Sequence, residues 1–273
     1  MSDIDVSALA REMLSAYDTG DRIPVPLSAR CEGFDLKSAY AVEAEVSRLR
    51  KQIGRRTVGL KVGYANKAVW RALKLDTLVW ASMYDDTVHY AGAGPATLSL
   101  PYYRSPRIEP EIVFHVKRPA DAGLDAAGAL DCVDWFAIGF EIIDCPYPEW
   151  QFKPPDFVAS LGLHLALVVG KPHALEPQAA ADLVNKLANF KLRVSKDGQF
   201  VEEGAGRNAL RNPALCLAEL AGAVIRQSGT ASLSAGDHVS TGTLTSGHPI
   251  ARGETWEVQV DSLQIDPLTL RLT

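Results

Sequence analysis

Two glutamates lie two positions apart in an apolar stretch, residues 107–116, Arg-Ile-Glu-Pro-Glu-Ile-Val-Phe-His-Val. Successive side chains of a strand alternate between its faces, so Glu109 and Glu111 would share one face. Two carboxylates roughly 7 Å apart on one face repel each other unless they are solvated or bridged by a cation. Pro110 lies between them and removes one ladder hydrogen bond, which indicates an edge strand or an irregular one.

A third carboxylate, Glu141, lies in a second apolar stretch, residues 137–144, Ala-Ile-Gly-Phe-Glu-Ile-Ile-Asp. An ionised glutamate within an apolar strand is costly without a partner. Three carboxylates from two strands would form the hard, oxygen-rich ligand set that suits Mg²⁺ or Mn²⁺. On the residues alone, surface or buried ion pairs remain an equal alternative.

Lys61 lies between two glycines in the segment Gly59-Leu-Lys-Val-Gly63. Glycines on the same face leave space around the ammonium, which suits the close approach of a ligand. The lysine could pair with a substrate carboxylate or, with a lowered pKa, move protons. The alternative is a lysine whose stem is covered and whose ammonium extends to solvent.

A run of small hydroxyl residues and glycines covers residues 240–248, Ser-Thr-Gly-Thr-Leu-Thr-Ser-Gly-His. Such a run at a strand end can present backbone N–H groups and hydroxyls to an anion. A simple turn is the alternative.

The surrounding elements follow from apolar periodicity. Spacings of three and four predict helices over 7–17, 36–53, 177–187 and 213–227, and short apolar runs predict strands over 57–64, 108–117, 135–143, 163–169, 190–195, 238–243 and 254–260. This order predicts an α+β protein in which a helical arm of about fifty residues precedes a strand-rich body. No glycine-rich phosphate loop follows a strand, so a nucleotide-cofactor fold lacks support.

Composition limits the partners and the compartment. The net charge of −5 and pI near 5.7 argue against nucleic acid as a partner, since phosphate binding needs a concentrated cationic face. The four cysteines form no Cys-x-x-Cys pair, which disfavours a zinc knuckle and indicates reduced thiols in the cytoplasm. The N-terminus shows no signal peptide, and the longest apolar run, residues 163–169, is too short to span a membrane.

The ordered motifs resemble a known family. Gly-x-Lys-Val-Gly, Asp85-Asp86, Arg-x-Glu-x-Glu, Glu-Ile-Ile-Asp and Gly-Asp-x-x-x-Thr-Gly follow one another as in the fumarylacetoacetate hydrolase superfamily. Between about residues 5 and 262 the chain looks most like the branch that holds the 2-keto-4-pentenoate and 2-oxohept-3-ene-1,7-dioate hydratases and the 4-oxalocrotonate decarboxylases.

The resemblance implies a fold and a cofactor. The fold would be a mixed β-sandwich roll, residues 56–273, preceded by a helical arm, residues 1–55. The cofactor would be Mg²⁺ or Mn²⁺ held by Glu109, Glu111 and Glu141. The family's members form homo-oligomers and associate with a pathway decarboxylase or hydratase, so we expect the same of this chain.

The resemblance also implies contacts to a small 2-oxo acid. Lys61 would lie beside the substrate, and Asp85 or Asp86 would reach the site and help to shuttle protons. Thr241, Gly242 and Thr243 match the loop that holds the substrate carboxylate.

The chain departs from the branch's pattern at a few positions. Ser160 and Leu161 stand where an Asp-Asn pair is usual, which makes Ser160 a candidate substrate contact. His164 and His248 are candidates for local replacements, the alternative for each being a structural histidine with satisfied hydrogen bonds. The His-Glu pair that ring-cleavage hydrolases of the superfamily carry on a lid helix has no obvious counterpart here, and Glu32 is a candidate for its base.

The activities that the resemblance implies share one enolate chemistry. We expect first a hydratase that adds water to a 2-hydroxydienoate or 2-oxo-enoic acid in aromatic-compound catabolism, which makes the chain a hydro-lyase. A 4-oxalocrotonate-type decarboxylase comes second and an acylpyruvate C–C hydrolase third. The alternative to an enzyme is a catalytically silent partner subunit.

Overall fold

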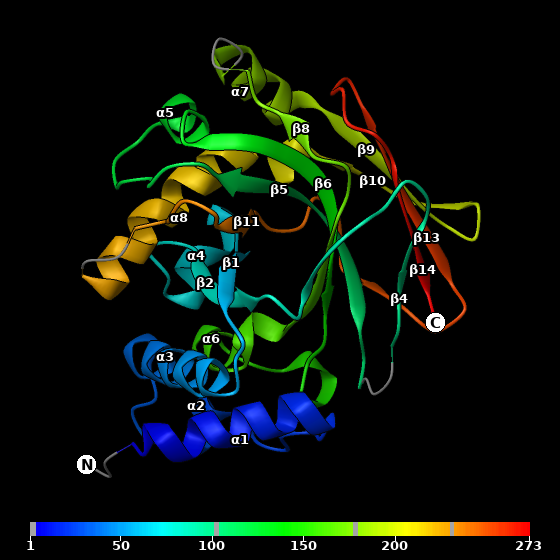
Figure 1. Ribbon diagram of the computed structural model, residues 1–273. Coiled ribbons are helices and arrows are strands. Elements are labelled where there is room, and N and C mark those ends of the chain that lie inside the picture. The colour runs from blue at the N-terminus through cyan, green and yellow to red at the C-terminus, as the bar shows by residue number, and fades with distance from the viewer. Residues whose placement is uncertain (1–3, 101–103, 177–179, 230–231) are drawn as a thin grey trace.

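The computed structural model describes residues 4–100, 104–176, 180–229 and 232–273. Three helices open the chain: α1 (Val6–Thr19), α2 (Leu27–Arg30) and α3 (Leu36–Gln52). The side chains of Asp5 and Asp35 accept hydrogen bonds from the first turns of α1 and α3, which satisfies backbone donors that the helices leave unpaired. Figure 1 shows these three helices together at one end of the molecule.

The larger sheet carries the catalytic candidates. Among the described residues it has nine strands, in the order β2-β1-β11-β5-β6-β7-β3, with β12 beside β5 and β8 beside β6. Their bounds are β1 Thr57–Gly63, β2 Val79–Tyr84, β3 Val88–Tyr90, β5 Arg107–Val116, β6 Val133–Ile143, β7 His164–Val169, β8 His173–Ala174, β11 His238–Ser240 and β12 His248–Pro249. The pairs β1–β11 and β3–β7 are parallel and the other pairs are antiparallel, so the sheet is mixed.

The smaller sheet lies beside the larger one and contains the last strands of the chain (Figure 1). Its five strands in the described residues follow the order β10-β9-β13-β14-β4. Their bounds are β4 Ala96–Leu98, β9 Lys191–Lys196, β10 Gln199–Ala205, β13 Thr255–Asp261 and β14 Leu268–Leu272.

Helices close the remaining faces. Their bounds are α4 Lys67–Leu73, α5 Ala126–Leu130, α6 Pro154–Ala159, α7 Ala180–Asn189 and α8 Pro213–Ser228, with short 3₁₀ turns η1 Pro148–Trp150, η2 Leu161–Leu163 and η3 Gly206–Asn208. Helix α6 contacts α2, α3 and β2, so it joins the N-terminal helices to the larger sheet. Helix α8 contacts α5, α7 and β2.

The predicted fold class is confirmed: the chain is α+β, with curled sheets preceded by helices. The predicted long helices and strands lie within a few residues of the observed ones, although residues 177–179 of one predicted helix are outside the described part. The elements that were not predicted are strands β2, β3, β4, β8, β10, β12 and β14 and helices α2, α4, α5 and α6. The division into residues 1–55 and 56–273 stays a prediction.

Across the described residues, no helix has both the length and the apolar character that a bilayer crossing demands.

Candidate metal centre and active site

Strand register brings the three glutamates together. The antiparallel pairing of β5 with β6 sets Glu109 directly opposite Glu141 and Glu111 opposite Gly139. Carboxylate oxygens of Glu109, Glu111 and Glu141 all lie within 4.8 Å of one another. The parallel pairing of β1 with β11 adds Lys61 beside Ser240 on the neighbouring strands. The three carboxylates therefore lie close enough together to bind one ion, and the ammonium of Lys61 lies next to them.

Glu111 is held by one oxygen and leaves the other without a partner. Its Oε2 accepts hydrogen bonds from Ser240 Oγ at 2.6 Å and from the backbone N–H of Gly242 at 2.7 Å. Its Oε1 is buried and accepts no hydrogen bond within the described part of the chain. A buried carboxylate oxygen without a donor is costly. Together with two further carboxylates within reach, it fits a hard divalent cation bound to oxygen ligands.

Two of the three glutamates have raised pKa values, because they are buried close to other carboxylates. Burial, together with the charge of Glu141, raises the pKa of Glu109 to about 7, against the opposing effect of Lys61. Burial and the charges of both other glutamates raise the pKa of Glu111 well above its usual value. A bound divalent cation would favour the ionised forms.

Glu141 is the ionised member of the group. Burial opposes its charge, but Lys61 and His164 outweigh burial and lower the pKa of Glu141. Lys61 Nζ lies 3.1 Å from Glu141 Oε2, and His164 Nδ1 lies 2.8 Å from Glu141 Oε1. Because a carboxylate can only accept, Nδ1 of His164 carries the hydrogen of this contact.

Lys61 is almost fully buried. Its Nζ donates to the carbonyl of Gly162 at 3.0 Å and lies 4.8 Å from the centre of the Phe157 ring. Burial disfavours its charge, but the three carboxylates outweigh burial and raise the pKa of Lys61. The sequence left open a role in which Lys61 has a lowered pKa, and these charges do not favour it, because the attraction of the carboxylates for the ammonium exceeds its desolvation cost.

His164 connects the glutamates to the turn between β2 and β3. Its Nε2 lies 3.0 Å from Thr87 Oγ1, and the Thr87 hydroxyl is itself bonded to the backbone of Tyr84. The histidine has satisfied hydrogen bonds, as the structural alternative predicted, yet one of its partners is a candidate metal ligand. Thr87 was not singled out in the sequence, where no pattern distinguishes it from other turn threonines.

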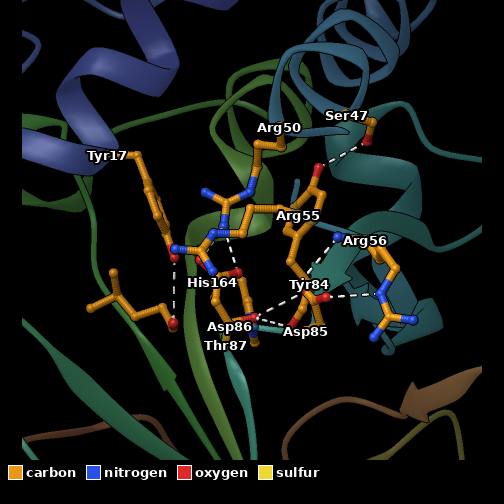
Figure 2. Close-up of polar contacts among 11 residues, drawn as sticks. Tyr17, Ser47, Arg50, Arg55, Arg56, Tyr84, Asp85, Asp86, Thr87 and His164 are labelled. Carbon is orange, nitrogen blue, oxygen red and sulfur yellow. Dashed lines mark hydrogen bonds and ion pairs between the residues drawn. The ribbon is translucent and has the colours of Figure 1, made fainter. Parts of the chain in front are cut away.

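The structure does not bring Asp85 or Asp86 to the carboxylate cluster. Asp86 accepts two hydrogen bonds from Arg50 at 2.7 and 2.8 Å, and Asp85 lies 3.0 Å from Arg56 Nε. Figure 2 shows both aspartates turned toward arginines at the end of α3 and just after it. Neither lines the main cavity, so the expectation that one of them reaches the site is corrected. Their partners are cations, which hold the two carboxylates away from the site.

A cavity of about 960 Å³ opens on the carboxylate cluster. Lys61, Glu109, Gly242 and Thr243 are among the residues of its wall, together with apolar and aromatic side chains: Tyr64, Val69, Ile143, Trp150, Phe152, Phe157 and Leu163. Thr241 is buried and donates its hydroxyl hydrogen to the carbonyl of Ile112, outside the wall. Of the predicted anion loop, Gly242 and Thr243 thus border the cavity.

Ser160 and His248 lie beside the site and not in its wall. The hydroxyl of Ser160 is 2.6 Å from that of Tyr147, in a buried contact near helix α1. His248 Nε2 lies 2.7 Å from Glu202 Oε2, and Glu202 does border the cavity. Glu32 is exposed and also lies outside the wall. The aromatic wall and the nearby Arg207 and Arg211 were missed, since loop residues carry no periodicity.

Comparison with known proteins agrees with the fold. The family model described as fumarylacetoacetate (FAA) hydrolase C-terminal matches residues 77–268. A 2-hydroxypent-2,4-dienoate hydratase of Pseudomonas putida is 31% identical over 223 residues, 79% of this chain and 94% of the relative. A 2-keto-4-pentenoate hydratase of Burkholderia vietnamiensis is 28% identical over 96% of this chain and 95% of the relative.

Two further matches are to 4-oxalocrotonate decarboxylases. A 4-oxalocrotonate decarboxylase of a Pseudomonas species is 29% identical over 81% of this chain and 82% of the relative. The structure of 4-oxalocrotonate decarboxylase from Pseudomonas putida G7, complexed with magnesium and adipate, matches with a TM-score of 0.88 and 22% identity, covering 100% of this chain and 99% of that one.

Proposed function

The chain belongs to the fumarylacetoacetate hydrolase family, and from this premise we propose that it is a hydro-lyase that adds water to a 2-hydroxydienoate in aromatic-compound catabolism. The observation that carries the proposal is the cluster of Glu109, Glu111 and Glu141, with Lys61 in contact, beside a cavity whose wall includes apolar and aromatic side chains. Relatives named as hydratases for such dienoates support it.

Glu109, Glu111 and Glu141 would hold the cation, which is Mg²⁺ or Mn²⁺. When bound, the cation would supply electrophilic stabilisation of the negative charge that develops on the 2-oxo oxygen of the substrate. Glu111 Oε1 is buried and accepts no hydrogen bond in the described part of the chain, so contact with the cation would stabilise this oxygen.

Lys61 is placed to move a proton. Its Nζ contacts Glu141, and Lys61 is one of the residues of the cavity wall, so a substrate at the cluster would lie within its reach. A positioned acid or base of this kind contributes roughly 10²–10⁴-fold to a rate. Lys61 would transfer the proton that converts the 2-hydroxydienoate to its 2-oxo-enoic tautomer, to which water then adds at C4.

The remaining wall would position the substrate. Thr243 and Gly242 border the cavity beside Glu111 and would face the substrate carboxylate. Phe152 and Phe157 would pack against the planar diene and exclude bulk water, which strengthens electrostatic interactions at the reacting end.

A 4-oxalocrotonate-type decarboxylase is the second candidate, supported by a relative with that name at 29% identity. The same cluster would stabilise the dienolate that remains when CO₂ leaves. An acylpyruvate hydrolase has less support, since it needs a general base. Apart from Glu109, the only carboxylate in the described cavity wall is Glu202, which His248 and Ser246 already engage.

We further propose that the protein is a cytoplasmic homo-oligomer and that it associates with a pathway decarboxylase or hydratase. Light scattering of the purified protein would give its mass in solution, and co-purification would test the association. A monomer that captures no such enzyme would contradict these two expectations.

The experiment that tests the function is turnover. Purified protein with Mg²⁺ should deplete the ultraviolet absorbance of 2-hydroxypenta-2,4-dienoate and give a 4-hydroxy-2-oxo acid by NMR. Release of CO₂ from 4-oxalocrotonate without hydration of the dienoate would favour the decarboxylase. No change with either substrate would favour a catalytically silent relative.

A further inference from the structure

The two carboxylate oxygens of Glu111 have different surroundings. Oε2 accepts hydrogen bonds from the Ser240 hydroxyl at 2.6 Å and from the Gly242 N–H at 2.7 Å, whereas Oε1 accepts none in the described part of the chain. Each oxygen of a carboxylate offers about two acceptor positions. Both positions of Oε2 are therefore occupied by protein donors, and Oε1 is the oxygen left for an ion.

The sheet fixes the hydroxyl donor. Ser240 is fully buried at the end of β11, opposite Val113 of β5. Glu111 precedes Val113 by two residues and shares its face of the strand, so the Ser240 hydroxyl reaches it diagonally across the strand pair. A distance of 2.6 Å is typical of a hydroxyl that donates to a carboxylate.

The backbone donor is fixed by the residues around it. Gly242 has a φ of 94°, and a Cβ added there would lie 2.8 Å from the Cβ of Ala65, so only glycine brings this N–H to Glu111 without strain. The preceding Thr241 donates both its N–H and its hydroxyl hydrogen to the carbonyl of Ile112. The segment 240–242 is thus attached to β5 at the residue that follows Glu111.

Glu141 is restricted in a similar way. His164 Nδ1 lies 2.8 Å from its Oε1, and Lys61 Nζ lies 3.1 Å from its Oε2. Ca²⁺ takes about six to eight oxygen ligands and often binds both oxygens of one carboxylate, whereas the smaller Mg²⁺ requires a near-ideal octahedron. Because Glu111 and Glu141 both have oxygens engaged by protein donors, the cluster offers few chelating oxygens and favours the smaller cation.

We infer that Ser240 sets the preference of the glutamate cluster for Mg²⁺ over Ca²⁺, because its hydroxyl occupies Glu111 Oε2 and limits Glu111 to one ligand oxygen. The inference rests on the proposed function, which makes the three glutamates the ligands of the cation. Ser240 is a positioning residue, since it acts through Glu111. It is also the donor that a substitution can remove, because the N–H of Gly242 belongs to the main chain.

A ratio of two affinities tests the role of Ser240 without turnover. Ser240→Ala removes the hydroxyl and adds no atom. Titration calorimetry of the chelator-treated protein should show Mg²⁺ affinity about tenfold lower, from the loss of a group that orients a ligand. Ca²⁺ affinity should stay unchanged or rise, since Oε2 becomes available as a second ligand oxygen. The ratio of the Ca²⁺ to the Mg²⁺ dissociation constant should therefore fall by about tenfold, whereas a general loosening of the fold would weaken both cations alike.

The control is Ser82→Ala, which removes another buried hydroxyl of the same sheet, one that contacts Ser47. It should keep the wild-type ratio. An unchanged ratio in Ser240→Ala, or an equal change in Ser82→Ala, would overturn the inference. A wild-type protein that binds neither cation would contradict the proposed metal centre itself, so the two failures are distinguishable.

A crystal structure of the wild-type protein with Mn²⁺ gives a test that needs no variant. Glu111 should bind the ion through Oε1 alone, while Oε2 keeps its hydrogen bonds from Ser240 and Gly242. Binding of the ion by both oxygens of Glu111, with the Ser240 hydroxyl turned away, would contradict the role of Ser240 whatever the affinities show.

Discussion

His164 Nδ1 lies 2.8 Å from Glu141 Oε1, and both side chains are almost completely buried. The register between β6 and β7 shifts near this point, after Ile142 pairs with Ala166, and His164 stands opposite Ile143. Glu141 is thereby contacted by a histidine on one oxygen and by Lys61 on the other. Such a partner orients a ligand carboxylate and is itself held by Thr87.

Replacing His164 should weaken metal binding. We expect His164→Ala to lower the affinity for Mn²⁺ by about 10- to 100-fold, since loss of a group that orients a ligand typically has that effect. Titration calorimetry of the chelator-treated protein measures it. His89→Ala removes an exposed histidine of β3 as the control. Unchanged affinity in a folded His164→Ala protein would mean that the histidine is structural only.

Glu111→Gln should keep the fold and lose the metal. The amide oxygen can still accept from Ser240 and Gly242, but the second position becomes an NH₂ group that repels a cation. Mg²⁺ at 100 times its Kd stabilises a protein by about 2.7 kcal/mol, so the wild-type melting temperature should rise with Mg²⁺ while that of the variant stays constant. An equal rise in both proteins would remove Glu111 from the ligand set.

Strand alternation set Glu109 and Glu111 on one face and Glu141 on the face opposite its apolar neighbours, but it left ion pairs as an equal alternative; the family resemblance grouped the three as ligands of one metal. It could not supply the β5–β6 register that sets Glu109 opposite Glu141. That pairing depends on contacts between segments distant in sequence. The family's motifs therefore supplied the set of residues, and neither the motifs nor strand alternation supplied its geometry.

The expectations for Asp85 and Asp86 failed for a related reason. The Asp-Asp motif specifies a turn, but Arg50 and Arg56 determine where its side chains point. Similarly, Ser160 faces Tyr147 at the junction with the N-terminal helices, where sequence motifs alone give no contact. Polar partners elsewhere in the fold decided each case: arginines for Asp85 and Asp86, and the Tyr147 hydroxyl for Ser160.

Lys61→Met should separate metal binding from catalysis. Methionine retains the length of the buried stem, and loss of a positive charge beside Glu141 favours a cation, so affinity for Mg²⁺ should be unchanged or higher. Turnover should fall by at least about 100-fold with the loss of a proton donor. The measurement pairs calorimetry with the dienoate absorbance assay. Wild-type turnover would rule out a proton role.

Asp86→Asn should affect stability and spare the metal site. Arg50 is 2% exposed, and its two hydrogen bonds to Asp86 compensate for burying its charge (Figure 2). The Asp86 side chain is 27% exposed, so we expect a loss of about 2 kcal/mol, below the value for a fully buried pair. Urea unfolding gives this loss, and calorimetry should give wild-type Mg²⁺ affinity. Reduced affinity with wild-type stability would instead return Asp86 to the site.

Glu43 of α3 should make stability depend on pH in a definite direction. It is buried where its carboxylate accepts from Ser82 N–H at 3.1 Å, and burial raises its pKa above the usual value. A pKa raised by folding stabilises the protein below the unfolded value near 4.5, and this contribution is lost as the pH rises through the folded value. Glu43→Gln should therefore gain stability relative to wild type from pH 5 upward, by at most about 1.4 kcal/mol per pH unit. Urea unfolding of both proteins in chelator, from pH 5 to 9, isolates Glu43 because their other groups are identical. A stability difference that stays constant or shrinks over that range would show that Glu43 is ionised in the folded protein throughout.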